Sequence, residues 1–124
     1  MARILICDDS AFMRMMLKKV LIDKGHEVVG EAGNGKQAVQ LYREFTPDLV
    51  TMDITMPVMD GLEAMKCIRE ADTQAKIIMV TAIGQQEVVT EAVRAGAADF
   101  IVKPFNPEFV IEIIEKVLNN VKRT

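Results

Sequence analysis

Five polar residues that could do chemistry each follow a short apolar run of the chain. Asp8 and Asp9 follow the first run, and Asp53 follows the second. Thr81 follows the third run, and Lys103 follows the fourth. If the runs are parallel strands of one sheet, three carboxylates, a hydroxyl and an ammonium meet at the edge where the strands end. In open α/β sheets that edge is where ligands bind. The apolar runs are 4–7, 49–52, 77–80 and 100–102.

These groups together favour a hard cation and phosphoryl transfer. Three neighbouring carboxylates repel one another, which favours either protonation or a bound cation. Oxygen ligands without a nearby His or Cys suit Mg2+ better than Zn2+, and Mg2+ held by carboxylates keeps positions open for phosphate oxygens. The lysine and the threonine would then neutralise and position a phosphoryl group, which an aspartate can accept as a nucleophile. The residues therefore predict phosphoryl transfer onto a carboxylate.

Strand and helix patterns alternate along the whole chain, which is typical of a parallel sheet with helices on both faces. Ser10 suits the cap of the first helix, which is expected to end before Gly25. Pro107 suits the first turn of the last helix. The expected strands end at residues 7, 32, 53, 80 and 102, and the expected helices cover residues 11–24, 36–44, 61–70, 85–95 and 106 onward.

Apolar residues recur at helical spacing in three of these helices. Those of the fourth helix are expected to face inward, and those of the last helix form one broad stripe. The residues are Phe12, Met15, Met16, Val20 and the neighbouring leucines in the first helix; Val88, Val89, Ala92 and Val93 in the fourth; and Phe109, Val110, Ile113, Ile114, Val117, Leu118 and Val121 in the last.

The composition indicates one globular domain over residues 1–124, with 50% hydrophobic and 27% charged residues. The formal net charge of -3 argues against a nucleic-acid binder. No apolar run approaches the roughly 18 residues needed to insert across a membrane, and no signal-peptide pattern opens the chain. Cys7 and Cys67 lack metal-type spacing and are expected to be free thiols, so the cytoplasm is the expected compartment.

Five short motifs occur in the order and spacing of a known family. They are Asp8-Asp9, Asp53, Pro57 with Gly61, Thr81-Ala82 and Lys103-Pro104-Phe105. Over its whole length the chain resembles the response-regulator receiver family. The resemblance implies a doubly wound, flavodoxin-like α/β fold with a five-stranded parallel sheet of order 2-1-3-4-5. Within the family, residues 10–14 and 52–57 look most like the single-domain chemotaxis regulators, which carry no output domain.

The resemblance implies a phosphoacceptor switch that acts on itself, not a conventional enzyme. Asp53 would accept a phosphoryl group from a phosphohistidine on a sensor histidine kinase. Asp9 and Asp53 would bind Mg2+ directly, Asp8 mainly through water, and Thr55 through its main-chain carbonyl. Lys103 would pair with the phosphoryl group, and a cis Lys103-Pro104 bond is expected.

The resemblance also implies how the switch reaches a partner. Thr81 would move to hydrogen-bond the phosphoryl group and free space for Phe100, a position where many relatives have Tyr. The face formed by the fourth helix and by the fifth strand and helix would then bind a target, expected to be the flagellar motor switch. Thr55 and Ile83 tend to set the phosphoryl lifetime. Neither carries a charge or an amide that could orient water, so we expect slow self-dephosphorylation and a separate phosphatase.

Several alternatives remain open from the sequence. The chain would also suit a phosphorelay intermediate or the receiver of a longer regulator. A phosphatase of the haloacid-dehalogenase type is remote, because it needs an acid where this chain has Thr55. A flavodoxin-like FMN binder is disfavoured, because Asp8 and Asp9 would repel its phosphate without a metal. We expect a monomer that binds neither nucleic acid nor membranes.

Overall fold

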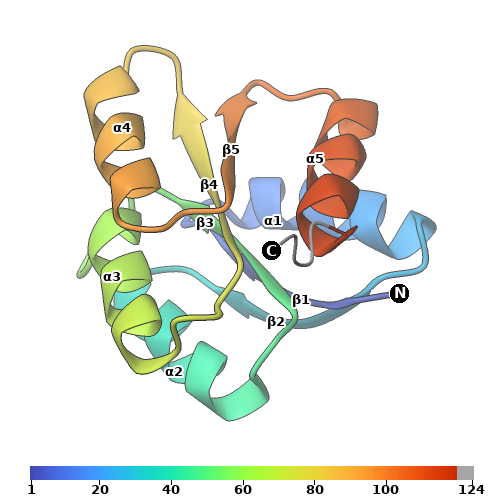
Figure 1. Ribbon diagram of the computed structural model, residues 1–124. Coiled ribbons are helices and arrows are strands. Elements are labelled where there is room, and N and C mark those ends of the chain that lie inside the picture. Colours follow the sequence, from blue (N-terminus) through green and yellow to red (C-terminus); the bar gives the residue numbers. More distant parts are fainter. Residues whose placement is uncertain (120–124) are drawn as a thin grey trace.

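The computed structural model describes residues 1–119 and has a central sheet with helices on both faces (Figure 1). Its strands are β1 (Arg3–Cys7), β2 (Glu27–Ala32), β3 (Leu49–Asp53), β4 (Ile77–Ala82) and β5 (Asp99–Lys103). Its helices are α1 (Ala11–Asp23), α2 (Gly35–Phe45), α3 (Gly61–Ala71), α4 (Gln86–Arg94) and α5 (Pro107–Asn119). All strand pairs are parallel, in the order β2-β1-β3-β4-β5. The predicted doubly wound fold is confirmed.

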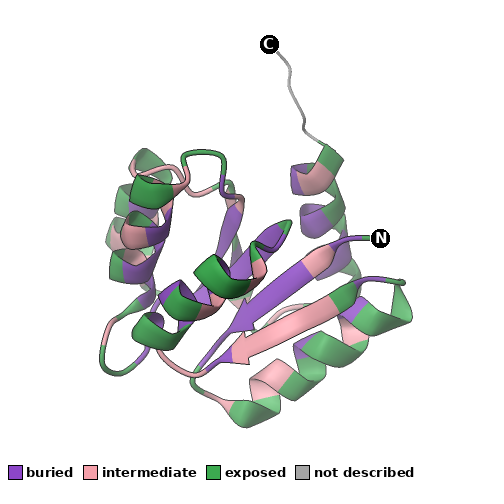
Figure 2. Cartoon of the chain, turned by 90° about the horizontal axis from the view of Figure 1, so that it is seen from below, coloured by how far each residue is buried: buried purple, intermediate pink, exposed green. Residues whose placement is uncertain are grey.

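The burial of each strand follows its place in the sheet. Every residue of the central strand β3 is buried, because helices cover both faces of a parallel sheet. The edge strand β2 is mostly half-buried, and Figure 2 shows it beside the more deeply buried β1. Within residues 1–119, no helix has the length and apolar character needed to cross a membrane.

Two apolar cores lie on opposite faces of the sheet, because successive residues of a strand point to opposite sides. On β4, Ile77 and Met79 enter the core under α2, α3 and α4, whereas Ile78 enters the core under α1 and α5. Figure 1 shows the two groups of helices on either side of the sheet. The strands are therefore held from both faces, and their carboxyl ends occupy fixed positions.

Several apolar helix residues lie outside the cores, which differs from the sequence prediction. Val93 was expected to face inward but is 50% exposed, and Phe109 of the α5 stripe is 48% exposed. On α1, Phe12 and Met15 are more than half exposed. The reason is that a helix on a sheet buries one stripe, which Leu17 and Leu21 form on α1. Val121 lies outside the described residues.

Candidate functional site

The loop after β1 is fixed by short hydrogen bonds around Asp8. The amide of Ser10 donates to Asp8 Oδ1 at 2.9 Å, and Ser10 Oγ caps α1 by accepting from the Met13 amide at 3.2 Å. Arg14 Nη1 donates to the main-chain oxygen of Asp8 at 2.7 Å, a contact that sequence reasoning missed. Ser10 is the cap, as predicted, and because Asp8 accepts from the Ser10 amide through Oδ1, its Oδ2 is left for the site.

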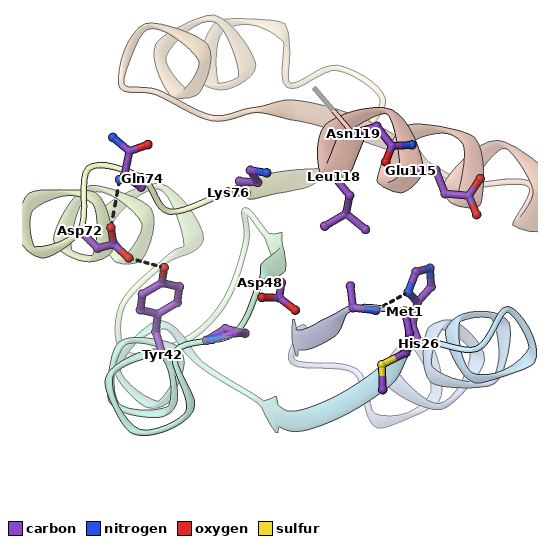
Figure 3. Close-up of a pocket in the computed structure, with 12 residues that line it drawn as sticks. Met1, His26, Tyr42, Asp48, Asp72, Gln74, Lys76, Glu115, Leu118 and Asn119 are labelled. Atoms are coloured by element: carbon purple, nitrogen blue, oxygen red, sulfur yellow. Dashed lines mark hydrogen bonds between the residues drawn. The ribbon is translucent and has the colours of Figure 1, made fainter. Parts of the chain in front are cut away.

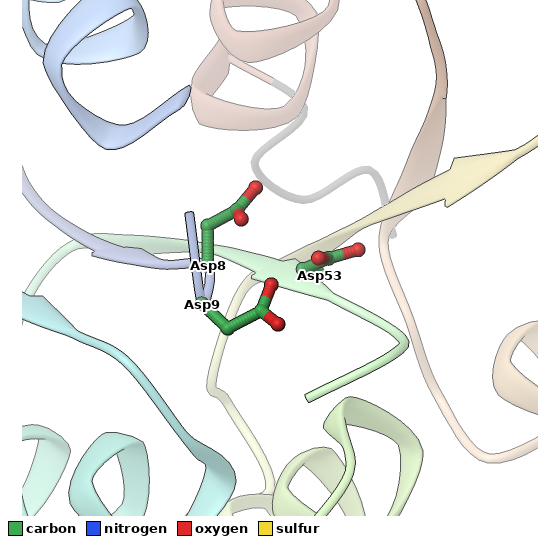
Figure 4. Close-up of side chains that lie close together, drawn as sticks. All are labelled: Asp8, Asp9 and Asp53. Atoms are coloured by element: carbon green, nitrogen blue, oxygen red, sulfur yellow. The ribbon is translucent and has the colours of Figure 1, made fainter. Parts of the chain in front are cut away.

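Three aspartates meet at the carboxyl ends of β1 and β3. Carboxylate oxygens of Asp8, Asp9 and Asp53 all lie within 4.8 Å of one another, and Figure 4 shows the three side chains gathered at this edge. Asp8 is 6% exposed and Asp53 is 7% exposed, whereas Asp9 is open to solvent. The predicted convergence of the three carboxylates is therefore present in the structure.

Lys103 joins this cluster from the end of β5. Its Nζ donates to Asp8 Oδ2 at 3.0 Å and lies 3.4 Å from Asp53 Oδ2. The Lys103-Pro104 peptide bond is cis, as the resemblance implied. One ammonium thus contacts two of the three carboxylates, which leaves the cluster with an excess of negative charge.

The excess negative charge and the burial of the cluster shift the pKa values of Asp53 and Lys103. Burial first, and then the charge of Asp8, raise the pKa of Asp53 to about 6, although Lys103 opposes the rise. Burial lowers the pKa of the Lys103 ammonium, but the hydrogen bonds and charges of Asp8 and Asp53 outweigh it, so this pKa lies above its ordinary value. The site therefore holds a charged lysine beside a carboxyl group that ionises with difficulty.

A glycine lets the loop after β3 fold back against Asp53. The Gly61 amide donates to the Ile54 oxygen at 2.8 Å. A Cβ atom at Gly61 would overlap the main-chain oxygen of Asp53, so any larger residue would displace the strand end. Gly61 is thus needed for the position of Asp53, and the start of α3 is fixed beside it.

Thr81 lies at the end of β4 and is 2% exposed. Its hydroxyl donates to Gln85 Oε1 at 2.8 Å, and Gln85 Nε2 lies 3.3 Å from the Thr55 hydroxyl. Sequence reasoning missed Gln85, because a polar residue at the start of α4 is typical of a helix cap. Its side chain makes no cap hydrogen bond. The side-chain amide of Gln85 therefore lies beside Thr55. Thr55 is one of the two lifetime-setting positions that carry no amide of their own.

Phe100 and Ile83 lie outside the acidic cluster. Phe100 is 39% exposed and lines a groove of about 610 Å³ between α4 and β5, which is mostly apolar. Ile83 is 79% exposed and lies in the loop between β4 and α4. The groove begins at Thr81 and continues past Val89 and Val102, so it adjoins the site without containing any of its carboxylates.

A separate cleft of about 650 Å³ lies at the opposite end of the sheet, where the strands begin (Figure 3). In this cleft Tyr42 donates to Asp72 at 2.8 Å, and the Ala2 amide donates to His26 Nδ1 at 3.1 Å, whereas the buried His26 Nε2 has no partner among residues 1–119. The cleft holds none of the residues that chemistry singled out. The acidic edge is therefore the candidate site.

Comparisons with known proteins agree with this geometry. The profile of the response regulator receiver domain matches residues 4–115. Chemotaxis protein CheY of Bacillus subtilis is 62% identical over 117 residues, 94% of this chain and 98% of the relative. Chemotaxis protein CheY of Thermotoga maritima is 58% identical over 115 residues, 93% of this chain and 96% of the relative.

A solved structure has the same fold. A chain in the crystal structure of the CheX-CheY-BeF3-Mg+2 complex from Borrelia burgdorferi matches with a TM-score of 0.89 and 36% sequence identity, covering 93% of this chain and 87% of that chain. The matched residues include the strand ends that carry Asp8, Asp9, Asp53, Thr81 and Lys103. The chain therefore belongs to the response regulator receiver domain family, as a member similar to the CheY chemotaxis regulators.

Proposed function

We propose that the chain is a two-component switch in which Asp53 accepts a phosphoryl group from the phosphohistidine of a sensor histidine kinase. The observation that carries the proposal is the contact of Lys103 Nζ with Asp8 and Asp53 inside the acidic cluster. A buried nucleophile beside a cation meets the two needs of phosphoryl transfer, which are charge neutralisation and positioning. The protein acts on itself and turns over no separate substrate.

The acidic cluster fits Mg2+. Its donors are carboxylate oxygens within 4.8 Å of one another, and oxygen is the ligand that Mg2+ prefers. We assign direct binding to Asp9 and Asp53, binding mainly through water to Asp8, and a main-chain carbonyl ligand to Thr55. When bound, the ion supplies positive charge that offsets the charge of the carboxylates and of the phosphoryl oxygens.

Asp53 is the nucleophile of the proposed reaction. Its pKa of about 6 leaves the carboxyl group mostly ionised at neutral pH, so an oxygen lone pair can attack phosphorus. A new O–P bond forms as the P–N bond of the phosphohistidine breaks, and the electron pair of that bond returns to the imidazole. Lys103 Nζ, already 3.4 Å from Asp53 Oδ2, then pairs with the phosphoryl oxygens.

Thr81 connects the phosphoryl group to the output face. It lies on β4, next to β3, which ends at Asp53. A hydrogen bond from the Thr81 hydroxyl to a phosphoryl oxygen draws Thr81 toward Asp53. The movement frees space for Phe100, which turns inward from the groove between α4 and β5. A target that prefers the altered face binds the phosphorylated state more tightly and in turn stabilises it.

We propose the flagellar motor switch as that target, because curated relatives that are 62% and 58% identical to this chain are chemotaxis proteins. The partners are then a chemotaxis histidine kinase, the motor switch and a separate phosphatase. The phosphatase is needed because Thr55 and Ile83 make self-dephosphorylation of Asp53 slow. The free thiols Cys7 and Cys67 support a reducing, cytoplasmic environment. The protein acts as a single receiver domain and a monomer.

The assignment of Asp53 is tested by labelling with a phosphorylated histidine kinase. Asp53→Asn should abolish labelling, and removal of Mg2+ should abolish it in the unchanged protein. Asp23→Asn is the matched control, because Asp23 is exposed at the far end of α1 and should label normally. Labelling of Asp53→Asn on another residue would refute the assignment, and transfer without metal would remove Mg2+ from the mechanism.

The output is tested by titration with a peptide from a flagellar motor switch protein. The protein is compared with and without Mg2+ and beryllofluoride, a stable substitute for the phosphoryl group. Tighter binding in the activated state supports the chemotaxis output. Activation without a gain in affinity would favour a phosphorelay carrier instead.

A further inference from the structure

Gln85 makes three hydrogen bonds that join both loops beside the proposed phosphoryl site. Its Oε1 lies 2.8 Å from the Thr81 hydroxyl and 2.8 Å from the Ala82 amide. Its Nε2 lies 3.3 Å from the hydroxyl of Thr55, in the loop between β3 and α3. One side chain therefore contacts the end of β4 and the loop that follows Asp53.

The chemistry of these partners fixes the direction of each hydrogen bond. The Ala82 amide can only donate, so the Gln85 atom beside it must be the carbonyl oxygen. The Thr81 hydroxyl approaches the same oxygen and must also donate. The amide nitrogen then faces Thr55 as a donor, which uses Thr55 as an acceptor. The arrangement is consistent in all three contacts.

Helix capping does not explain this geometry. Gln85 occupies the cap position of α4, but its side chain accepts no hydrogen bond from the first turn of that helix. It turns back toward β4 instead, and the residue is only partly exposed. The side chain is therefore directed at Thr81 and Ala82 and not at the helix.

A hydroxyl group has one proton, so Thr81 cannot donate to Gln85 and to a phosphoryl oxygen at the same time. Thr81 is 2% exposed, which limits its access to water as a replacement partner. Its other acceptor, the main-chain oxygen of Ala82, is more distant at 3.2 Å. The hydrogen bond to Gln85 must therefore break before Thr81 can serve the phosphoryl group.

We propose that Gln85 is a positioning residue that holds the Thr81 hydroxyl in the resting orientation and so opposes activation. Its loss removes a hydrogen bond that exists in the resting state alone, which shifts the equilibrium toward the activated state. The inference rests on the proposed function, because it assumes that Thr81 binds the phosphoryl group. The inference adds Gln85, at the start of α4, as a residue that controls how readily Thr81 turns to the phosphoryl group.

The test compares Gln85→Met with Gln86→Met. Met keeps the length of Gln without its hydrogen bonds, and the exposed neighbour Gln86 is a matched control, because its side chain forms none of these contacts. In the protein without metal, Gln85→Met should shift the Ala82 amide proton upfield in the NMR spectrum. In the presence of Mg2+, it should bind beryllofluoride about fivefold more tightly, the effect of one ordinary hydrogen bond. Gln86→Met should change neither.

A double variant tests whether Gln85 acts through Thr81. In a Thr81→Ala background, Gln85→Met should leave the affinity for beryllofluoride unchanged, because the hydroxyl is already absent. Gln85→Ala is measured in parallel and should give the same direction, so the test does not depend on the folding of one variant. An equal gain in affinity with and without the Thr81 hydroxyl would overturn the inference.

The outcomes separate this inference from the proposed function. If the unchanged protein binds no beryllofluoride in the presence of Mg2+, the proposed function fails. If it binds, and Gln85→Met binds equally or more weakly, the proposed role of Gln85 fails while the function stands. Weaker binding would mean that Gln85 contacts the phosphoryl group itself.

Discussion

Replacing Asp53 by Asn should stabilise the metal-free protein, because the native carboxylate is ionised at a cost. Burial and the nearby Asp8 raise the Asp53 pKa to about 6, whereas an unfolded aspartate has a pKa of about 3.9. Between these values the folded state binds more protons than the unfolded state, so the free energy of unfolding falls as the pH rises. Above about pH 7 this loss is complete and stays constant.

The size of the effect follows from the shift. A rise of about two pKa units corresponds to an upper limit of about 3 kcal/mol. Solvent reaches the cluster beside Asp9, which screens the repulsion, so we expect a gain of about 1–2 kcal/mol for Asp53→Asn near pH 7.5. The gain should shrink as the pH falls below about 6 and vanish near pH 3, where the Asp53 carboxyl group is protonated in both states.

Urea unfolding followed by circular dichroism, with a chelator present and at several pH values, measures this difference. Asp23→Asn serves as the control and should follow the unchanged protein at every pH, because its carboxylate is exposed at the end of α1. Added Mg2+ should stabilise the unchanged protein more than Asp53→Asn, which lacks a ligand. A variant that is less stable than the unchanged protein near pH 7.5, or a gap that does not vary with pH, would refute this reasoning.

Two further predictions concern packing near the site, and both are checked by urea unfolding. Gly61→Ala should destabilise the protein by about 3 kcal/mol or more and weaken beryllofluoride binding, because the new Cβ overlaps the Asp53 main-chain oxygen. Gly33→Ala, whose Cβ meets Arg14 at an ordinary 3.7 Å, should stay within about 0.5 kcal/mol, and an equal loss in both variants would contradict the steric argument. Thr51→Val should stabilise by about 1 kcal/mol, because the buried Thr51 hydroxyl has no hydrogen-bond partner among residues 1–119; a loss of stability would reveal a partner such as a buried water.

Much of the site could be predicted from the sequence because it depends on strand ends. Parallel strands end at one edge, so the apolar runs before Asp8, Asp53 and Lys103 are enough to bring these residues together. The alternation of strands and helices predicts the fold for the same reason. The cis Lys103-Pro104 bond could be predicted from the family resemblance alone.

Gln85 and the outer faces of the helices could not be predicted in this way. The sequence shows a polar residue at the start of α4, but the direction of its side chain depends on the β4 amide and hydroxyl groups that it meets. On α1, apolar residues occupy more than one face, and periodicity does not reveal that Leu17 is buried while Phe12 is exposed. Tertiary contacts between distant segments determine the direction of the Gln85 side chain and which face of α1 is buried.

The two-sided anchoring of β4 has a consequence for how receivers diversify. Because Ile77 and Met79 pack in one core and Ile78 in the other, the main chain of β4 is anchored independently of the loop that follows it. In that loop Ile83 is 79% exposed, and substitutions at such a position change stability little, whereas the φ of 96° at Gly84 favours glycine. Mutation can therefore vary position 83 at little risk to the fold, and natural selection can adjust the sensitivity of the signal while the positions of the strand ends are inherited unchanged.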